Sequence, residues 1–291
     1  MKRKIKLLLF ILLLIPISLL TTACTNDDMD NIRILVTNYP NEYLIKELYG
    51  EHATITSVYP DGITLEDYNF NKKQKNDFSR YDLFIYNGLV EKERTLAMDL
   101  LEINPDLRII DTAYVLKTDY SPEELWLNPS SLLMMAQNIR LGLKEYITNN
   151  YLAKEVDENY EDLKVTLSEL DANYRVAVEN TNDKTVIVGN SALKYLEKFG
   201  LTVICLDNDA TDKTIANAQE LVNNGDVSYI LLFKNQELPE NAAKFLENNS
   251  SIKKLELHKL DNLTDTERSE KKTYQTLTEE NLDVLKQELY Q

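Results

Sequence analysis

The sequence predicts an α/β protein of two Rossmann-like lobes, each a four-stranded, mainly parallel sheet with flanking helices, joined by a long rigid spine helix. Three observations support this fold class. Short apolar runs alternate with helical patterns up to about residue 110, a long apolar stripe of helical spacing follows, and the strand–helix alternation returns from residue 185 onward. Strands that alternate with helices need crossover connections and therefore form parallel sheets.

The first 24 residues follow the order of a signal peptide. A basic start, Met1 to Lys6, precedes an apolar run from Leu7 to Leu20 that Pro16 interrupts, and small residues then lead to Cys24. A membrane-spanning helix needs about 20 apolar residues, and this run is shorter. The end of the segment resembles the bacterial lipobox, in which the cysteine is lipidated and becomes the new N-terminus, although Thr21 stands where leucine is usual.

We therefore expect a signal peptide at 1–23, a lipid anchor that includes palmitate on Cys24, and a polar linker over 24–31. This predicts a protein held at the cell membrane, on its extracytoplasmic face. The formal net charge of −16 becomes −20 in the mature chain, because the removed segment holds four basic and no acidic residues. So acidic a chain argues against a nucleic-acid partner, whose phosphates need clustered Lys and Arg.

The N-terminal lobe is predicted over residues 32–150. Ile32, Ile34 and Val36 alternate with other residues in a first strand, and Gly50 ends the helix that follows. We expect strands at 32–36, 53–59, 82–86 and 107–110, and helices at 40–48, 71–79 and 91–103.

A helical segment then separates the two halves of the chain. Pro129 and Ser130 suit a helix start, and apolar residues recur at helical spacing from Leu132 to Ile147. A second stripe covers the 27 residues from Leu152 to Val178, roughly 40 Å at 1.5 Å per residue. We assign the connecting helix to 151–180 and expect it to bridge the lobes and limit their movement.

The C-terminal lobe is predicted over residues 181–291 with the same plan. We expect strands at 185–188, 202–206, 228–233 and 253–257, and helices at 192–199, 214–224, 239–248 and 274–289. Ligands of open α/β sheets bind beyond the carboxyl ends of the strands, so two facing lobes predict a site in the cleft between them.

The sequence lacks the motifs of nucleotide binding and of catalysis. It contains no GxGxxG or GxxxxGK loop, no Gly-x-Ser-x-Gly elbow and no His-Glu-x-x-His pair. We therefore predict that the protein is not an enzyme. A carboxylate pair of Glu66 and Glu124 acting on a glycoside stays open as an enzymatic alternative, but a single Trp offers few of the aromatic platforms that a glycosidase cleft uses.

Cysteine and histidine are scarce. Apart from Cys24 the chain has only Cys205, which lies in an apolar run and is expected to be a buried core thiol. The two histidines, His52 and His258, are expected at the surface, although His258 is close enough to Asp261 in sequence to reach the cleft.

Several motifs occur in an order and spacing that resemble one family. They are Pro60-Asp61-Gly62 with Tyr68, the stretch from Tyr81 to Gly88, Trp126-Leu127-Asn128-Pro129, the spine helix, Ala192 with Tyr195-Leu196 and Gly200-Leu201, and Tyr274 with Asn281 and Leu285. The family is that of the zinc- and manganese-type (ZnuA-like) solute-binding lipoproteins of bacterial ABC transporters. The resemblance implies two rigid lobes, a metal held in the cleft by side chains of both, and docking onto a membrane permease.

The resemblance also implies four metal ligands, Glu66, Glu124, Asn190 and Asp261. Members of the family typically present histidine at the positions of Glu66 and Glu124, and histidine or glutamate at that of Asn190. Only the aspartate, Asp261, agrees with the family's pattern. The usual histidine ligands are thus replaced by oxygen donors.

An all-oxygen ligand set favours a hard cation. Zinc prefers nitrogen and sulfur ligands, whereas calcium, magnesium and manganese accept oxygen. Three carboxylates brought together would repel one another and raise their pKa values, so they need a cation, a basic partner or open water. We therefore predict manganese or another hard divalent cation, rather than zinc, as the transported ligand.

The sequence thus predicts an extracytoplasmic solute-binding lipoprotein of a metal ABC transporter, a monomer whose partners are a permease and the lipid bilayer. The alternative is a degenerate paralogue that binds no metal and acts as a receptor for another ligand, or as a surface adhesin or scaffold. Fold alone does not separate the two.

Overall fold

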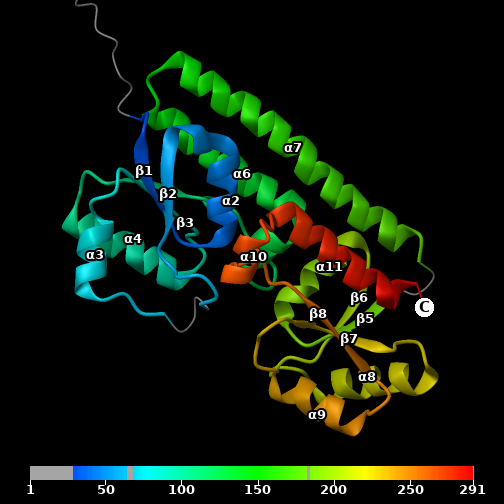
Figure 1. Ribbon diagram of the computed structural model, residues 1–291. Helices are drawn as coiled ribbons and strands as arrows, with labels where there is room; N and C mark the ends of the chain where they lie inside the picture. The colour runs from blue at the N-terminus through cyan, green and yellow to red at the C-terminus, as the bar shows by residue number, and fades with distance from the viewer. Residues whose placement is uncertain (1–28, 64–67, 182–183, 291) are drawn as a thin grey trace, which may run out of the picture.

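The structure, a computed structural model, describes residues 29–63, 68–181 and 184–290. Figure 1 shows two α/β lobes, with the long helix α7 running beside both. Strands of the first lobe follow the order β2-β1-β3-β4, strands of the second follow the order β6-β5-β7-β8, and every neighbouring pair is parallel. The predicted fold class, with two four-stranded parallel sheets and flanking helices, is therefore confirmed.

The strands lie close to their predicted positions. Their bounds are β1 Ile32–Val36, β2 Ala53–Ser57, β3 Leu83–Tyr86, β4 Arg108–Asp111, β5 Thr185–Val188, β6 Thr202–Cys205, β7 Tyr229–Phe233 and β8 Lys253–Leu257. The main difference is β2, which ends two residues earlier than predicted. The N–H of Val58 still donates to the carbonyl of Val36 (2.8 Å), but β1 ends at Val36 and provides no further residue for pairing.

The helices of the N-terminal lobe are α2 Tyr39–Tyr49, η1 Gly50–His52, α3 Lys72–Phe78, α4 Glu91–Ile103, α5 Glu124–Leu127 and α6 Pro129–Tyr146. The side chain of Asn38 caps α2 by accepting from the N–H of Asn41, and Asn128 caps α6 by accepting from Ser130. Such caps satisfy N–H groups that have no partner within the helix. The four-residue helix α5 was not predicted, because one turn is too short to show periodicity.

Helix α7, Asn150–Glu179, is the predicted spine. Its buried residues follow the predicted stripe: Leu152, Val156, Tyr160, Leu163, Leu167, Leu170, Tyr174, Ala177 and Val178. It packs on α2 and α6 of the first lobe and on α11 of the second (Figure 1). One helix face is therefore buried against both lobes.

The C-terminal lobe contains η2 Ser191–Phe199, α8 Asp212–Asn224, α9 Glu240–Asn248, α10 Asp265–Ser269 and α11 Tyr274–Leu289. The segment predicted as a helix over 192–199 is a 3₁₀ helix, and α10 was not predicted. Gly200 follows η2 with φ of 97°, a left-handed conformation that glycine adopts without strain.

A single apolar core extends through both lobes. It includes Val36 of β1, Leu167 of α7 and Val188 of β5, all fully buried. Two smaller clusters lie on the opposite faces of the sheets, one beneath α4 around Phe84 and one beneath α8 and α9 around Ile187. The faces that the two sheets turn toward the spine thus belong to one packed interior.

The structure corrects the prediction for the histidines. His258 is 8% exposed; its Nδ1 accepts from the N–H of Leu260 (2.9 Å) and its Nε2 lies 3.1 Å from Glu267 Oε1. The side chain of His52 is 18% exposed and lies 3.0 Å from Asp30 and 3.2 Å from Glu155. Each ring pairs with acidic residues from other segments of the chain: Glu267 for His258, and Asp30 and Glu155 for His52. A local sequence pattern around the histidines does not reveal these partners.

Cys205, by contrast, is a buried free thiol as predicted. Within the described ranges, no helix is long and apolar enough to cross a membrane. The signal peptide and Cys24 lie outside those ranges, so the lipidation of Cys24 stays a prediction.

Candidate functional site

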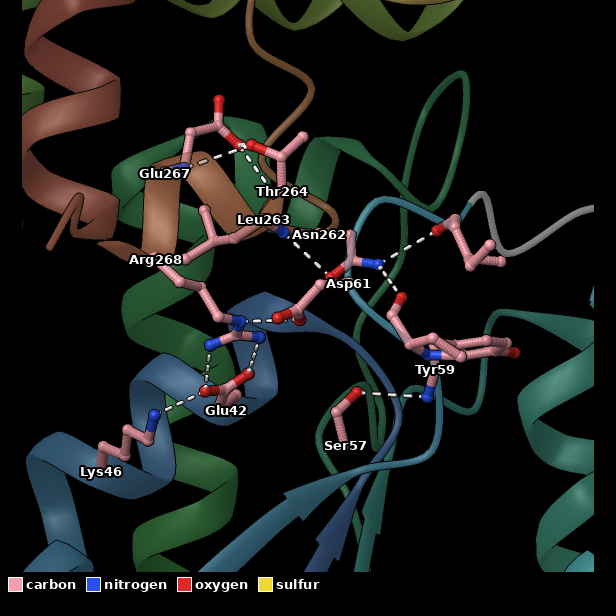
Figure 2. Close-up of polar contacts among 12 residues, drawn as sticks. Glu42, Lys46, Ser57, Tyr59, Asp61, Asn262, Leu263, Thr264, Glu267 and Arg268 are labelled. Carbon is pink, nitrogen blue, oxygen red and sulfur yellow. Dashed lines mark hydrogen bonds and ion pairs between the residues drawn. The ribbon is translucent and has the colours of Figure 1, made fainter. Parts of the chain in front are cut away.

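The lobes meet where the loop after β2 contacts the loop after β8. Asn262 donates from Nδ2 to the carbonyls of Pro60 (2.8 Å) and Ile63 (3.0 Å), and the N–H of Gly62 donates to the carbonyl of Leu263 (2.9 Å). Figure 2 shows these loops side by side, with Asn262 between them. The first lobe therefore presents its loop directly to the neighbourhood of Asp261.

Glu66 belongs to the continuation of that loop but lies outside the described residues. Ile63 is the last described residue before it. The position of Glu66 relative to Asp261 therefore stays a prediction.

Glu124 is the first residue of α5, and its side chain is fully buried. Oε1 accepts from the N–H groups of Tyr120 and Ser121 (2.9 Å to the latter), and Oε2 accepts from the N–H of Asp119 (3.3 Å) and faces Lys198 Nζ at 3.1 Å. Burial raises the pKa of Glu124, but the hydrogen bonds from Ser121, Tyr120 and Lys198 together outweigh it, so the pKa lies below its ordinary value. Glu124 is therefore an ionised carboxylate that is already surrounded by donors.

Asp261 lies in the loop after β8, and its backbone carbonyl accepts from the N–H of Tyr39 in the first lobe (3.0 Å). Its Oδ2 is 3.3 Å from the ammonium of Lys259. The same ammonium is 3.6 Å from Glu123 Oε1, and the carbonyl of Lys259 accepts from Trp126 Nε1 (3.0 Å). Lys259 thus connects Asp261 of one lobe with the α5 segment of the other.

The backbone between Lys259 and Asp261 is strained. Leu260, which is 1% exposed, has φ of 63°, and a non-glycine residue in the left-handed region costs about 1 kcal/mol or more. Strain of this kind persists where the surrounding structure enforces it, and it is concentrated at functional sites. Across this turn, the side chains of Lys259 and Asp261 pair with each other.

Asn190, the remaining candidate, caps η2: its Oδ1 accepts from the N–H of Ala192 (2.9 Å). Lys198, the partner of Glu124, lies near the other end of the same helix. Eight residues of 3₁₀ helix correspond to roughly 16 Å at 2.0 Å per residue. Asn190 thus contacts the first turn of η2, and Glu124 contacts the ammonium of a lysine that begins near the last turn.

A small cavity lies at the lobe interface. It has a volume of about 90 Å³ and is lined by residues of both lobes, among them Ile63, Lys234, Lys259 and Asp261. A water molecule takes up roughly 30 Å³ in the liquid, so the cavity is large enough for an ion with one or two waters but not for a fully hydrated divalent cation. Of the three described candidates, Asp261 alone lines it.

The described residues do not by themselves form a metal centre. Across residues 29–63, 68–181 and 184–290, no three His, Cys, Asp or Glu side chains are arranged to hold a metal ion. Glu124 and Asp261 have suitable oxygens, but each faces a lysine ammonium. A cation could use these oxygens only with Glu66 or other further ligands and after the lysines move, so convergence of the four predicted ligands stays a prediction.

Sequence reasoning missed Lys198, Lys259 and Glu123. Clustered carboxylates need a cation, a basic partner or open water, and the structure supplies basic partners to Glu124 and Asp261. Lys259 stands two residues before Asp261, and Glu123 directly precedes Glu124. Attention to charged residues next to the predicted ligands in sequence could have identified Lys259 and Glu123, but not Lys198.

The structure is thus that of a two-lobed α/β protein, in which both lobes share a core along one long helix and meet around a small cavity. The family model described as "ZnuA: Zinc-uptake complex component A periplasmic" matches residues 34–288. The chain belongs to this family.

Curated relatives agree with this assignment at low identity. The zinc-binding lipoprotein AdcA of Streptococcus pneumoniae (strain ATCC BAA-255 / R6) is 23% identical over 299 residues, covering 93% of this chain and 58% of AdcA. The zinc-binding protein AdcA of Streptococcus pyogenes serotype M6 is 22% identical over 327 residues, covering 98% of this chain and 61% of AdcA. The chain thus spans about three fifths of the length of these relatives.

Solved structures show the same fold. The Zn(II)-bound ZnuA-like domain of S. pneumoniae AdcA has a TM-score of 0.72 at 21% identity, with 90% of this chain and 100% of that domain covered. The metal-dependent lipoprotein YcdH of Bacillus subtilis has a TM-score of 0.73 at 19% identity, with 89% and 99% covered. The laminin-binding protein Lmb of Streptococcus agalactiae has a TM-score of 0.73 at 19% identity, with 89% and 100% covered.

Proposed function

We propose that the protein is the extracytoplasmic receptor of a metal-type ABC transporter and that it presents a divalent cation to a membrane permease. The observation that carries the proposal is the family match over residues 34–288. The position of Asp261 supports it: this proposed ligand lines a cavity to which both lobes contribute. The receptor is proposed to act as a monomer and not as an enzyme.

The proposed ligands are Glu66, Glu124, Asn190 and Asp261. All offer oxygen, which suits manganese, calcium or magnesium better than zinc. The named relatives bind zinc, so a preference for harder cations would be a property of this chain's own ligand set.

Metal content and thermal stability test the proposal. The mature chain, exposed to equal concentrations of manganese, zinc, calcium and magnesium, is expected to retain a hard cation by elemental mass spectrometry and to melt at a higher temperature with it, because binding to the folded state alone stabilises that state. Asp261→Asn should reduce the shift, whereas Asp226→Asn, at an exposed position just after α8 in the same lobe, should not. A chain that retains no divalent cation, and whose melting is unmoved by millimolar concentrations of each, would contradict the proposal.

Membrane attachment is proposed to occur through lipid on Cys24. Replacing Cys24 by serine removes the only thiol of the lipobox-like segment. The variant should leave the membrane fraction and appear in the soluble fraction with its fold intact. A Cys24→Ser chain that remains fully membrane-bound would exclude this anchor.

A second candidate function is favoured by the ion pairs of Lys198 and Lys259 with the proposed ligands. With these carboxylates neutralised internally, the chain would be a family member without metal, serving another ligand or acting at the cell surface. A structural neighbour is described as a bifunctional protein with adhesin and metal transporting activity, so both roles occur on this fold. Failure of every divalent cation in the experiment above would favour this candidate.

A further inference from the structure

Lys259 places a buried positive charge between the lobes. Its side chain is 8% exposed, and its ammonium lies 3.3 Å from Asp261 of the second lobe and 3.6 Å from Glu123 of the first. A buried ammonium is stable only when oppositely charged or polar groups replace its hydration. The two carboxylates supply this compensation, one from each lobe.

Lys198 brings a second positive charge to the lobe interface. It extends from η2 of the second lobe to the segment before α5 in the first, with Nζ 3.1 Å from Glu124 and 4.0 Å from Asp119. Its side chain is 34% exposed. Lys259 thus pairs with one carboxylate of each lobe, as a cation cargo held between two lobes would, whereas Lys198 carries its charge from the second lobe to two carboxylates of the first.

The hydrogen bonds of Glu124 show why such a lysine must compete with a cargo. An ionised carboxylate has about four lone-pair positions, and Glu124 already faces four donors. Three are backbone N–H groups fixed by the loop of residues 119–121. The fourth, Lys198, is the only donor on a flexible side chain, so a metal reaches this carboxylate only by displacing it.

We propose that Lys198 and Lys259 are built-in cations that occupy the charge positions of the cargo, so that a divalent cation binds only by displacing their ammonium groups from Glu124 and Asp261. This inference rests on the proposed location of the cargo site but not on the wild-type chain binding metal. Lys198 is the more exposed of the two, so its ammonium is displaced first, from Glu124. Lys259 is buried and bridges the lobes, so its displacement is the more costly step.

Charge-removing and charge-keeping variants distinguish this role from simple packing. Manganese binding is measured by titration calorimetry for the wild type and for Lys198→Met, Lys259→Met and the double variant, with circular dichroism to verify folding. Methionine keeps the length and apolar stem of lysine but removes the charge. Each removal should tighten manganese binding at least about tenfold, because a positive charge a few ångströms from the metal is lost.

Two controls are matched to these variants. Lys198→Arg keeps the charge and should leave the affinity within about twofold of the wild type. Lys154→Met removes a lysine that pairs with Glu158 at 2.6 Å on the exposed face of α7, away from the interface; it should also leave the affinity unchanged.

The outcomes separate this inference from the proposed function. A wild type that binds no manganese beside a double variant that does would support the inference and refute the metal-receptor function. A wild type that binds manganese, with folded variants binding it no more tightly, would overturn the inference and leave the function standing. If Lys259→Met does not fold, Lys198→Met alone decides, and folded variants that bind no manganese at all would also overturn the inference.

Discussion

Arg268 of α10 forms a bidentate ion pair with Glu42 of α2: its Nη1 donates to Oε1 (2.8 Å) and its Nη2 donates to Oε2 (2.8 Å). The Nε of Arg268 is also 2.6 Å from Asp61, at the start of the loop that leads to Glu66 (Figure 2). Glu42 is 7% exposed and Arg268 29% exposed, so water screens the pair only partly. One side chain of the second lobe thus holds a helix and a loop of the first.

Replacing Arg268 by methionine should destabilise the protein by roughly 3 kcal/mol, because it leaves the buried carboxylate of Glu42 with Lys46 as its remaining ion-pair partner. Urea unfolding monitored by circular dichroism measures this change. Lys73→Met removes an exposed pair with Asp77 and should cost less than about 1 kcal/mol. Equal losses in the two variants would show that the interlobe pair contributes no more than a surface pair.

Because the spine helix α7 is packed along its length, we expect the lobes to move little relative to each other. Leu167 of α7 is fully buried in the core that both sheets share, and a helix packed along its whole length resists hinge bending. Small-angle scattering with and without saturating manganese should therefore give nearly the same radius of gyration. A clear compaction on addition of the metal would show that the lobes close as rigid bodies.

The thiol of Cys205 should be unreactive in the folded protein. It is 6% exposed, and burial raises the pKa of its thiol to about 12, so almost no thiolate exists near neutral pH. In a Cys24→Ser chain, where it is the only thiol, it should react with a disulfide reagent at pH 8 only as the protein unfolds in urea. Rapid labelling without denaturant would indicate local opening of β6.

The sequence was sufficient for the fold because its elements depend on local patterns. Helix α4, Glu91–Ile103, and helix α11, Tyr274–Leu289, begin and end as predicted. Apolar periodicity and turn residues mark these boundaries regardless of the rest of the chain. The short helices α5 and α10 and the 3₁₀ character of η2 carry no periodic signal, and tertiary contacts determine them.

The candidate site was less predictable because its charges are paired by residues distant in sequence. Glu124 and Lys198 are 74 positions apart and meet only because η2 packs beside α5. No periodic pattern encodes such a meeting. His258 shows the same limit, since its Nε2 pairs with Glu267 of a helix that was not predicted.

Glu93 is a fully buried carboxyl at the carboxyl ends of β1 and β3. Its Oε2 accepts from Thr37 Oγ1 (2.5 Å) and from the N–H of Asn87 (2.7 Å), and its Oε1 accepts from Asn38 Nδ2 (3.2 Å). Burial raises its pKa from 4.5 to about 7, and the nearby charge of Asp111 adds to this, although the three donors oppose it. Asn38 directly precedes Tyr39, which contacts Asp261, so this carboxyl supports the first lobe's side of the interface.

The pKa of Glu93 predicts a pH dependence of stability with a defined sign. Because the folded-state pKa of about 7 exceeds the ordinary 4.5, the protonated form favours folding, and its contribution is complete below about pH 4.5 and is lost as the pH rises through 7. The loss amounts to about 3 kcal/mol at 1.36 kcal/mol per pKa unit. Glu93→Gln, which cannot ionise, should lack this part of the slope in urea unfolding between pH 5 and 8. Glu102→Gln, on the exposed side of α4, should retain it. Parallel stability profiles for the wild type and Glu93→Gln would mean that Glu93 is already ionised at pH 5 and that its three donors outweigh its burial.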